Sequence, residues 1–194
     1  MFTGIVTHLG KLNKRNNSIF TFTTKQSFCK KLKKGTSVSI NGVCLTVFEK
    51  PKDDAFSVEV MPQTFKKTML KKLEIDNVVN LELPTTAKTL FSGHIVSGHI
   101  DGVGVIKEVK VDGNSRMLTI TMPQDLGRYV VGKGSIAING ISLTVIDVAP
   151  AYFTVGIIPY TWKHTMLHQI EVGDSLNIEV DMIAKYLEKL LRKK

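Results

Sequence analysis

The chain of 194 residues has only two cysteines, Cys29 and Cys44, a single tryptophan and few aromatic residues overall. Two cysteines are too few for a disulfide framework, and neither has a partner at metal-ligand spacing, so we expect a reduced protein without a metal. No apolar run approaches the ~20 residues that a membrane helix needs. The opening, MFTGIVTHLG, has no basic stretch followed by an apolar one. We therefore expect no signal peptide, no membrane segment and a cytoplasmic location.

Negative charge is also scarce, since 26 lysines and arginines face 17 acidic residues and leave a net charge of +9. The excess comes from short, scattered clusters: Lys30–Lys31, Lys33–Lys34, Lys66–Lys67, Lys71–Lys72 and Arg192–Lys194. Few aromatic residues alternate with them, as a stacking platform for nucleic acid would require. We interpret the charge as a solvated surface and expect no nucleic-acid partner. An RNA-binding basic barrel is the alternative, and it would bind oligonucleotides in a salt-dependent way.

The sequence does contain a long internal repeat. NGVCLTV at 41–47 returns as NGISLTV at 139–145, which is 98 residues later. MPQTFKKTML at 61–70 matches IPYTWKHTML at 158–167, and IDNVVNLEL at 75–83 matches VGDSLNIEV at 172–180, both at an offset of 97. TGIVTHLGKL at 3–12 matches residues 97–106 at an offset of 94. Four blocks in register indicate a tandem duplication with small loop insertions.

Each copy carries the signals of β-structure. Short segments rich in β-branched or aromatic residues are separated by Asn-Gly, Lys-Gly and Asp-Gly pairs, and residues 18–24 and 116–122 alternate with period two. About six strands in some 85 residues, with no strand–helix alternation, predict a small closed barrel. We therefore expect an all-β protein of two tandem, pseudo-symmetric six-stranded antiparallel barrels. The expected domains are residues 1–88 and 89–180.

The C-terminal segment, 181–194, differs from the rest and is expected to form an α-helix. Asp181 stands at the N-cap position, and apolar residues follow at helical spacing: Ile183, Leu187, Leu190 and Leu191. A helix this short is marginal alone in water, so its apolar stripe should pack on something. Either a barrel surface or the same helix of a neighbouring subunit would serve.

The repeated strand sets a small polar pair on one face. Because side chains alternate along a strand, Cys44 and Thr46 point opposite to Leu45, and Ser142 and Thr144 point opposite to Leu143. Polar residues on such a face often meet only water. Retention of the pair in both copies, beside a glycine that permits close approach, favours a binding role. A duplicated site suits a reaction between two similar molecules, one held as donor and one as acceptor.

Other candidate residues lie near this strand in sequence. GHIVSGHIDG at 93–102 contains His94 and His99, and histidine is the usual proton-transfer residue near neutral pH, although a purely structural role is the alternative. Lys133 can clamp an anion or polarise a carbonyl, or it is an ordinary turn lysine. Residues 4–6, 61–64 and 157–162 can offer backbone groups to a flat heterocycle, or simply pair as strands. No residue has ligand spacing for zinc.

Five blocks in order resemble the riboflavin synthase family over essentially the whole chain: MFTGIV, NGVCLTV, SGHIVSGHIDG, KGSIAINGISLTV and the IPYT turn. The resemblance implies two six-stranded barrels and a C-terminal helix that joins three subunits into a homotrimer. It implies a dismutation in which one 6,7-dimethyl-8-ribityllumazine gives a four-carbon unit to another, forming riboflavin and 5-amino-6-ribitylamino-2,4-pyrimidinedione. No cofactor or metal is implied. The implied active site lies between the N-terminal barrel of one subunit and the C-terminal barrel of another.

The resemblance also implies which residues form the two pockets. In the first, Cys44 and Thr46 are expected beside Gly4, Ile5, Val6, Ser37, Leu45, Glu59, Val60, Met61, Pro62, Gln63 and Thr64. In the second, Ser142 and Thr144 are expected beside Gly98, His99, Ile100, Lys133, Leu143, Ile157, Ile158, Pro159, Tyr160, Thr161 and Trp162. We assign His99 and Ser142 to proton transfer and Cys44 to the nucleophilic step, with His94 and Asp181 as supporting residues.

One position departs from the family, whose second copy often has Asp-Gly where this chain has Asn139-Gly140. A neutral amide cannot act as a base, so we expect Asn139 to serve a tight turn, as Asn41 does in the first copy. If the family's aspartate tunes Ser142 or an imidazole, then either the neutral amide is sufficient here or Asp181 takes over that role. The alternative function is a non-catalytic antenna protein of the same fold, which binds a lumazine or flavin without converting it. The intact second-copy residues favour the enzyme.

Overall fold

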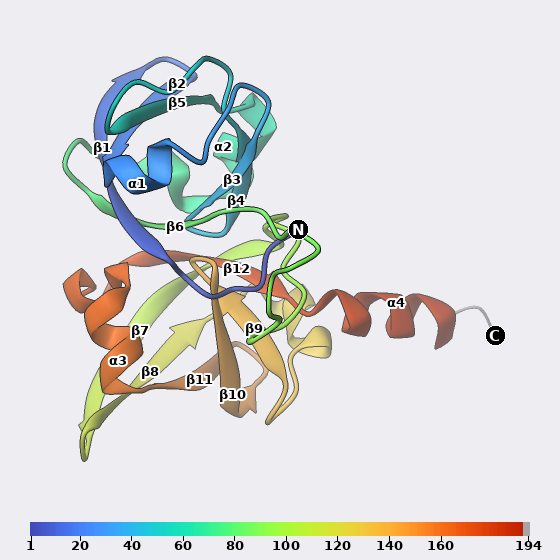
Figure 1. Cartoon of the computed structure of the whole chain (residues 1–194). Helices are drawn as coiled ribbons and strands as arrows, with labels where there is room; N and C mark the ends of the chain where they lie inside the picture. Colours follow the sequence, from blue (N-terminus) through green and yellow to red (C-terminus); the bar gives the residue numbers. More distant parts are fainter. Residues whose placement is uncertain (192–194) are drawn as a thin grey trace.

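The structure is a computed structural model that describes residues 1–191, and its first barrel is built from the N-terminal copy (Figure 1). Its six strands pair in the order β4-β3-β6-β1-β2-β5, and a bridge between Val47 and Val58 joins the two outer strands. The elements of this N-barrel are β1 (His8–Asn16), β2 (Ile19–Thr24), α1 (Gln26–Cys29), β3 (Ser37–Ile40), β4 (Val43–Thr46), β5 (Ala55–Glu59), α2 (Pro62–Lys67), η1 (Met69–Lys72) and β6 (Val78–Glu82).

The second copy repeats the arrangement as a closed barrel of order β10-β11-β8-β7-β12-β9. Every pairing in both barrels is antiparallel. The elements of this C-barrel are β7 (Gly102–Asp112), β8 (Ser115–Thr121), η2 (Gln124–Tyr129), β9 (Ser135–Ile138), β10 (Ile141–Ala149), β11 (Tyr152–Ile157), α3 (Pro159–His164), η3 (Met166–Gln169) and β12 (Ser175–Val180). The two tandem six-stranded barrels predicted from the repeat are confirmed.

Two short helices differ from the expectation of strand or loop. After β5 and β11 the chain turns into α2 and α3, which begin at Pro62 and Pro159. Proline is favoured at the first position of a helix, where its missing N–H needs no partner and its fixed φ fits. The "MPQT" and "IPYT" blocks are therefore helix starts at the mouth of each barrel.

Alternation along the repeated strand follows the sequence pattern. In β4, Val43 and Leu45 are buried, Cys44 is half-buried and Thr46 is exposed. In β10, Ile141 is buried while Ser142 is half-buried and Thr144 exposed. Each barrel has its own apolar core, which in the N-barrel includes the buried rings of Phe20, Phe22, Phe28 and Phe56. The small polar pair therefore lies on the outer face of each barrel.

Four buried asparagines join the barrels: Asn41, Asn80, Asn139 and Asn177. The side chain of Asn80 donates to the carbonyl of Asn139 (2.9 Å) and accepts from the backbone N–H of Met166 (2.8 Å). By pseudo-symmetry, Asn177 donates to the carbonyl of Asn41 (2.8 Å) and accepts from Met69 (2.7 Å). Within each barrel, Oδ1 of Asn41 and of Asn139 accepts from the amide of the strand asparagine, at 2.8 Å in both copies. This asparagine network ties the two barrels through fully paired amides.

The Asn-Gly pairs lie at the centre of this junction. Asn41 and Asn139 adopt φ of +45° and +44°, a left-handed conformation that asparagine tolerates. The glycines that follow meet across the junction, where a Cβ on Gly42 would lie 2.7 Å from the amide nitrogen of Gly140. The prediction that Asn139 serves a tight turn is confirmed. An aspartate there would put a charge into a buried amide network.

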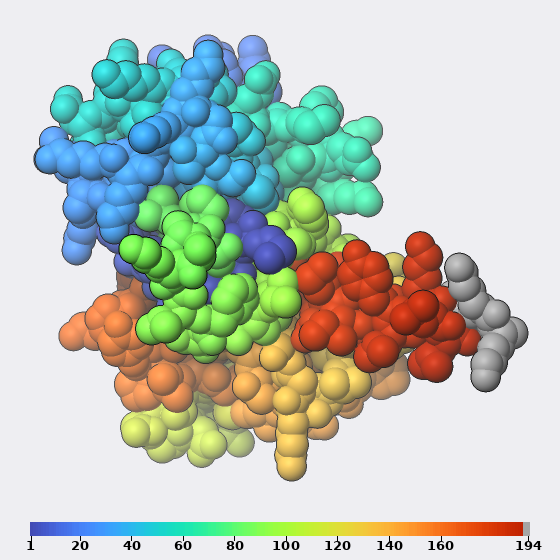
Figure 2. All heavy atoms as spheres, turned by 45° about the vertical axis from the view of Figure 1, so that its right-hand side comes forward, coloured from blue at the N-terminus to red at the C-terminus, as the bar shows by residue number. Residues whose placement is uncertain are grey.

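Two segments cross between the barrels, residues 2–6 and 96–100, which we call the crossing segments. They pair with each other where Phe2 and Val96 exchange backbone hydrogen bonds of 2.7 and 3.1 Å. Each then lies on the other copy's barrel. Ser142 N–H donates to the carbonyl of Gly4 (2.8 Å), and Cys44 N–H donates to that of Gly98 (2.9 Å). Figure 2 shows the blue N-terminal residues beside the green linker at the junction.

The C-terminal helix α4 (Met182–Leu191) projects away from both barrels (Figures 1 and 2). Asp181 caps it by accepting from the N–H of Ile183 at 2.9 Å, as predicted. Residues 192–194 of the predicted helix lie outside the described part of the chain. Ion pairs of Lys185 with Asp101 (2.6 Å) and Arg128 with Glu188 (3.2 Å) fix its direction from the C-barrel. Within residues 1–191, no helix has the length and apolarity needed to cross a membrane.

The asparagine network predicts a stability effect that can be measured. Asn177→Ala leaves the carbonyl of Asn41 and the N–H of Met69 without their partner in a buried site, which costs about 1–3 kcal/mol for each group. We expect the free energy of unfolding in guanidinium to fall by about 2–5 kcal/mol, and by a similar amount for Asn80→Ala. Asn114→Ala, in the exposed β7–β8 turn, is the control and should change it by less than about 0.5 kcal/mol. Equal effects at 114 and 177 would contradict the assignment.

Candidate functional site

A depression of about 650 Å³ lies on the outer face of β4 in the N-barrel. Its walls are the polar face of β4 and the junction of β5 with α2. Eight of the residues expected for the first pocket line it: Cys44, Leu45, Thr46, Glu59, Val60, Met61, Pro62 and Thr64. A second depression adjoins it and shares Cys44, Met61 and Thr64, and it adds Gln63, Gly98, His99 and Ile100. We call these two adjoining depressions the N-pocket.

The structure corrects the expected partners of each pocket. Residues 98–100 were expected beside Ser142, but they line the N-pocket, because the crossing segment that carries them lies on β4. Residues 4–6 were expected beside Cys44, but Gly4 bonds to Ser142 and Val6 packs on the C-barrel core. The sequence could not show that each crossing segment lies on the other barrel. Residues 2–6 lead into the first copy and residues 96–100 lead into the second, so each was expected to stay with its own copy.

The equivalent surface on the C-barrel surrounds Ser142, and by its correspondence to the N-pocket in the repeat we call it the C-pocket. Ser142 lies on β10, and the crossing segment 2–6 contacts it where Ser142 N–H donates to the carbonyl of Gly4. Gly4 fits against β10 because it has no side chain: a Cβ there would lie 2.6 Å from Cβ of Ser142. Its φ of +77° also suits glycine. Gly98 has the same role against Cys44.

His94 is the imidazole that reaches Ser142. Its Nδ1 shares a hydrogen bond of 2.7 Å with Ser142 Oγ. His99, which was expected there, is exposed on the N-pocket side. The correction follows from the crossing, because His94 precedes the point where residues 96–100 turn to the N-barrel. His94 is held in place by its own N–H, which donates to the carbonyl of Thr3 at 3.2 Å.

The surroundings of His94 keep its ring neutral at neutral pH. Burial lowers its pKa below the usual 6.5, and the negative charge of Asp181 raises it in part. Its Nε2 is buried and has no hydrogen-bond partner among the described residues. A neutral imidazole that is bonded to a hydroxyl through one nitrogen can take a proton from that hydroxyl, or pass one on through it.

The two pockets differ in the groups that can move a proton. Asp181 begins the turn into α4 close enough to His94 to influence its titration, whereas the aligned position in the first copy is Pro84. Ser142 is matched by Cys44, and the exposed His99 is matched by Ile5. In the C-pocket, therefore, a hydroxyl is bonded to an imidazole, and the negative charge of a carboxylate raises the pKa of that imidazole. The N-pocket offers a thiol and an imidazole carried by the crossing segment.

The remaining residues predicted for the second pocket lie on β10, at the end of β11 and on α3. Ile157 ends β11, and Ile158 and Tyr160 are more than half exposed at the start of α3. Trp162 packs on the C-barrel core with the guanidinium of Arg116 over its ring at 4.2 Å. Leu143 also packs on this core. The residues in this group are Leu143, Thr144, Ile157, Ile158, Pro159, Tyr160, Thr161 and Trp162.

Two predicted residues lie at the far end of the strand pairs. Lys133 sits in the turn before β9 with φ of +65°, donates its backbone N–H to Val145 (2.8 Å) and has an exposed side chain. Ser37 begins β3 and pairs with Thr46. The structure gives neither residue a contact with Cys44 or Ser142, so their binding roles remain predictions.

The two cysteines have different environments. Cys29 is 3% exposed in the N-barrel core, and burial raises the pKa of its thiol, with a further contribution from the negative charge of Asp54. Cys44 is half-buried and lines the N-pocket. Only the second thiol can reach a bound molecule.

Sequence reasoning missed two buried glutamates that hold the crossing segments. Glu82 accepts from the N–H and hydroxyl of Thr3 at 2.7 Å each, and from the N–H of Gly4 at 3.0 Å. Glu179 accepts in the same way from Ser97 at 2.6 Å and from Gly98 at 3.0 Å. The signal was present, because "VNLEL" and "LNIEV" keep an asparagine and a glutamate two residues apart in otherwise apolar strands. The contacts of Ser18, Phe48, Lys67 and Thr68 with the N-pocket were also missed.

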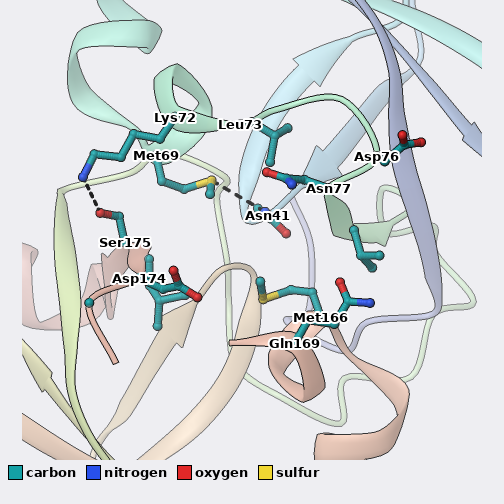
Figure 3. Close-up of a pocket in the computed structure, with 13 residues that line it drawn as sticks. Asn41, Met69, Lys72, Leu73, Asp76, Asn77, Met166, Gln169, Asp174 and Ser175 are labelled. Atoms are coloured by element: carbon teal, nitrogen blue, oxygen red, sulfur yellow. Dashed lines mark hydrogen bonds between the residues drawn. The ribbon is translucent and has the colours of Figure 1, made fainter. Parts of the chain in front are cut away.

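A further pocket, of about 300 Å³, lies between the barrels and contains none of the predicted site residues (Figure 3). Its floor is formed by Asn41, Met69 and Met166, and two facing turns form its walls. Lys72 Nζ donates to Ser175 Oγ across it at 2.8 Å. We call this pocket the seam. It belongs to the junction, whereas the N-pocket and C-pocket lie on the outer faces of the barrels.

Comparison with known proteins agrees with this arrangement. The lumazine binding domain family matches residues 3–84 and again residues 97–181. The riboflavin synthase of Actinobacillus pleuropneumoniae is 41% identical over 197 residues, covering 100% of this chain and 91% of that protein. The riboflavin synthase of Bacillus subtilis (strain 168) is 37% identical over 199 residues, with the same coverage.

Solved structures give the same result for the fold. LumP complexed with riboflavin superposes with a TM-score of 0.83 at 25% identity, covering 93% of this chain and 99% of that one. LumP complexed with 6,7-dimethyl-8-(1'-D-ribityl) lumazine gives a TM-score of 0.82 at 24% identity. Two matches to the domain family, together with relatives of up to 41% identity along the whole chain, show that this protein belongs to the riboflavin synthase family of lumazine-binding proteins.

Proposed function

We propose that this member of the riboflavin synthase family carries out the dismutation of two 6,7-dimethyl-8-ribityllumazine molecules, and that each pocket holds one of them. The observation that carries the proposal is the C-pocket pair, a neutral His94 bonded to Ser142 at 2.7 Å within a duplicated binding surface. The products are riboflavin and 5-amino-6-ribitylamino-2,4-pyrimidinedione. Four carbons pass from one substrate to the other, so the atoms of two identical reactants balance in two different products.

The duplicated pockets suit two flat heterocycles. Each has an outer strand face with a small polar pair and an adjoining helix start, closed on one side by a crossing segment. Orienting two reactants in register can by itself supply several kcal/mol of the acceleration. The two reactants are molecules of the same compound, so a single type of binding surface, present once in each barrel, is sufficient to bind both. The chemical differences between the pockets then decide which molecule donates.

We assign proton transfer to His94 and Ser142 of the C-pocket. The reaction must remove a proton from the acidic C7 methyl group of one lumazine and add a nucleophile at C7 of the other. His94 can accept a proton through Ser142, since its ring is neutral, and Asp181 then stabilises the imidazolium that forms. Cys44 remains the candidate at the nucleophilic step in the N-pocket. We assign His99 to the same pocket as Cys44, because both residues line one depression.

The antenna function is supported less well. LumP has the same fold and, by the names of its complexes, binds lumazine and flavins, but its identity to this chain is 24–25%. The riboflavin synthases reach 41% over the whole chain. An antenna protein needs one chromophore site, whereas here both pockets retain their polar pairs.

We further propose that the active assembly is a homotrimer formed through α4. Its apolar side chains are exposed to between 55% and 77%: Ile183, Tyr186, Leu187, Leu190 and Leu191. The barrels leave this stripe uncovered, which favours the second of the two alternatives, the same helix in neighbouring subunits. The N-pocket of one subunit would then face the C-pocket of another.

The dismutation predicts equal yields of two products from one substrate. Incubation with the lumazine alone, followed by chromatography, should give riboflavin and the pyrimidinedione in equal amounts. Ser142→Ala should lower kcat/KM by about 100-fold, because the proton relay to His94 is cut. Ser27→Ala, on the exposed face of α1, is the matched control and should leave it unchanged. Lumazine binding without either product would instead support the antenna function.

The neutral state of His94 predicts an acid limb in the pH profile. Its pKa lies below 6.5, so the active neutral form dominates at pH 7 and is lost as the pH falls through that lowered value. We expect kcat/KM of the native protein to decline below pH 6.5. His94→Gln should lower it about 100-fold and abolish this limb. His168→Gln, outside both pockets, should keep the limb. An unchanged acid limb in His94→Gln would exclude His94 as the titrating group.

The helix stripe predicts the oligomeric state. A double variant, Ile183→Glu with Leu187→Glu, places charges in the proposed interface, and sedimentation velocity should show monomers. Deleting residues 183–194 should have the same result. Turnover should fall while each pocket still binds riboflavin, because binding needs one subunit and reaction needs two. Lys189→Gln is the control on the same helix. A trimer that survives the double variant would refute this interface.

A further inference from the structure

We infer that Glu82 and Glu179 are positioning residues that act crosswise, so that each glutamate sets the ligand affinity of the pocket on the opposite barrel. The inference rests on the two pockets of the proposed function. The inference concerns how the crossing segments beside the two pockets are held in place. Glu82 and Glu179 do this without touching the substrate. It follows from the route of the crossing segments together with the hydrogen bonds of the two carboxylates.

Glu82 lies at the end of β6 in the N-barrel, yet it holds a wall of the C-pocket. Its Oε1 accepts both the N–H and the hydroxyl of Thr3, and its Oε2 accepts the N–H of Gly4. The next contact along this segment is the one from Gly4 to Ser142. Ile5 is then 41% exposed, and Val6 packs on the C-barrel core. The carboxylate therefore fixes the segment directly beside Ser142.

Glu179 repeats this arrangement in the opposite direction. It lies on β12 of the C-barrel, and its carboxylate accepts three bonds from Ser97 and Gly98. Gly98 in turn bonds to Cys44, and residues 98–100 line the N-pocket. Glu179 thus holds a wall of the pocket that belongs to the other barrel. Ile100, at the end of the segment, packs on the N-barrel core.

These contacts are too specific to be a by-product of burial. Glu82 is 6% exposed and Glu179 is 2% exposed, and a buried carboxylate is costly unless it is well hydrogen-bonded. Burial raises the pKa of Glu82, while the bonds from Thr3 and Gly4 lower it. A glycine with positive φ follows the first donor in each segment, with φ of +77° at Gly4 and +84° at Gly98. Each glycine is needed for close approach to the strand but is conformationally flexible, and the hydrogen bonds to the glutamate carboxylate hold its backbone in place.

The pockets can be observed separately because the chain supplies one reporter for each. Trp162 is the only tryptophan and belongs to α3 at the C-pocket, so 5-fluorotryptophan gives a single ¹⁹F resonance there. Cys44 lines the N-pocket, and its alkylation by iodoacetamide can be followed by mass spectrometry, with the buried Cys29 as internal reference. Riboflavin is the probe, because it is a product of the proposed reaction and is not consumed by it. The Kd of each pocket is read from the ¹⁹F titration or from protection of Cys44.

Glu82→Gln preserves size but sets an amide NH₂ against a backbone N–H. We expect the Kd of the C-pocket to rise about tenfold while the N-pocket is unchanged. Glu179→Gln should do the reverse. If these variants fold poorly, Thr3→Val and Ser97→Ala remove only the hydroxyl bonds and should give the same crosswise pattern at about threefold.

The control is Lys72→Ala, which removes the bond to Ser175 across the seam and touches neither crossing segment (Figure 3). It should leave both Kd values unchanged. Equal weakening of both pockets, weakening of the pocket on the glutamate's own barrel, or no change in either would overturn the inference. Absence of riboflavin binding at both reporters in the native protein would instead overturn the proposed function. Turnover with a crosswise pattern supports both.

Discussion

The arrangement of this protein depends on the pairing of buried amides at the junction of its two barrels. The side chains of Asn80 and Asn177 each hydrogen-bond to the other barrel. The side chains of Asn41 and Asn139 accept hydrogen bonds from the backbone of Asn80 and Asn177 within their own barrel. An unpaired amide in this place is costly, so the barrels can dock in one register only. That register brings Gly42 against Gly140 and sends residues 2–6 and 96–100 across the junction. Both pockets are consequences of this docking.

Each pocket is therefore a composite of the two copies. The strand face and helix start come from one copy, and the closing segment comes from the other. The likeness of the strand faces is suited to two molecules of one compound. The differences are concentrated in the closing and flanking residues, where His94 and Asp181 adjoin Ser142 while His99 adjoins Cys44. A nearly symmetric scaffold thus holds an asymmetric pair of proton-transfer groups.

The barrels, the duplicated pocket faces, the cap at Asp181 and the turn role of Asn139 could be predicted from the sequence. Strand alternation and turn residues act locally, so their pattern is visible in a short window. The partner of Ser142 could not be predicted, because it depends on where the linker crosses between barrels. For the same reason His99 was assigned to the pocket of Ser142 although it lies with Cys44, whereas His94, which was assigned only a supporting role, is bonded to Ser142. Glu82 and Glu179 occupy matching positions of the repeat, but the role of a buried glutamate in a strand cannot be predicted until its hydrogen-bond donors are known.

The docking also constrains how the two copies could diverge after duplication. Every residue of the asparagine network contacts the other copy. A substitution in one copy must therefore remain compatible with the equivalent residues of the other. Positions at the junction are consequently bound to change together. At Cys44 and Ser142 the other copy bonds only to the backbone, through Gly98 and Gly4, so these two side chains could become different. The two copies are therefore constrained together at the asparagine network, whereas the side chains that face the pockets are constrained less.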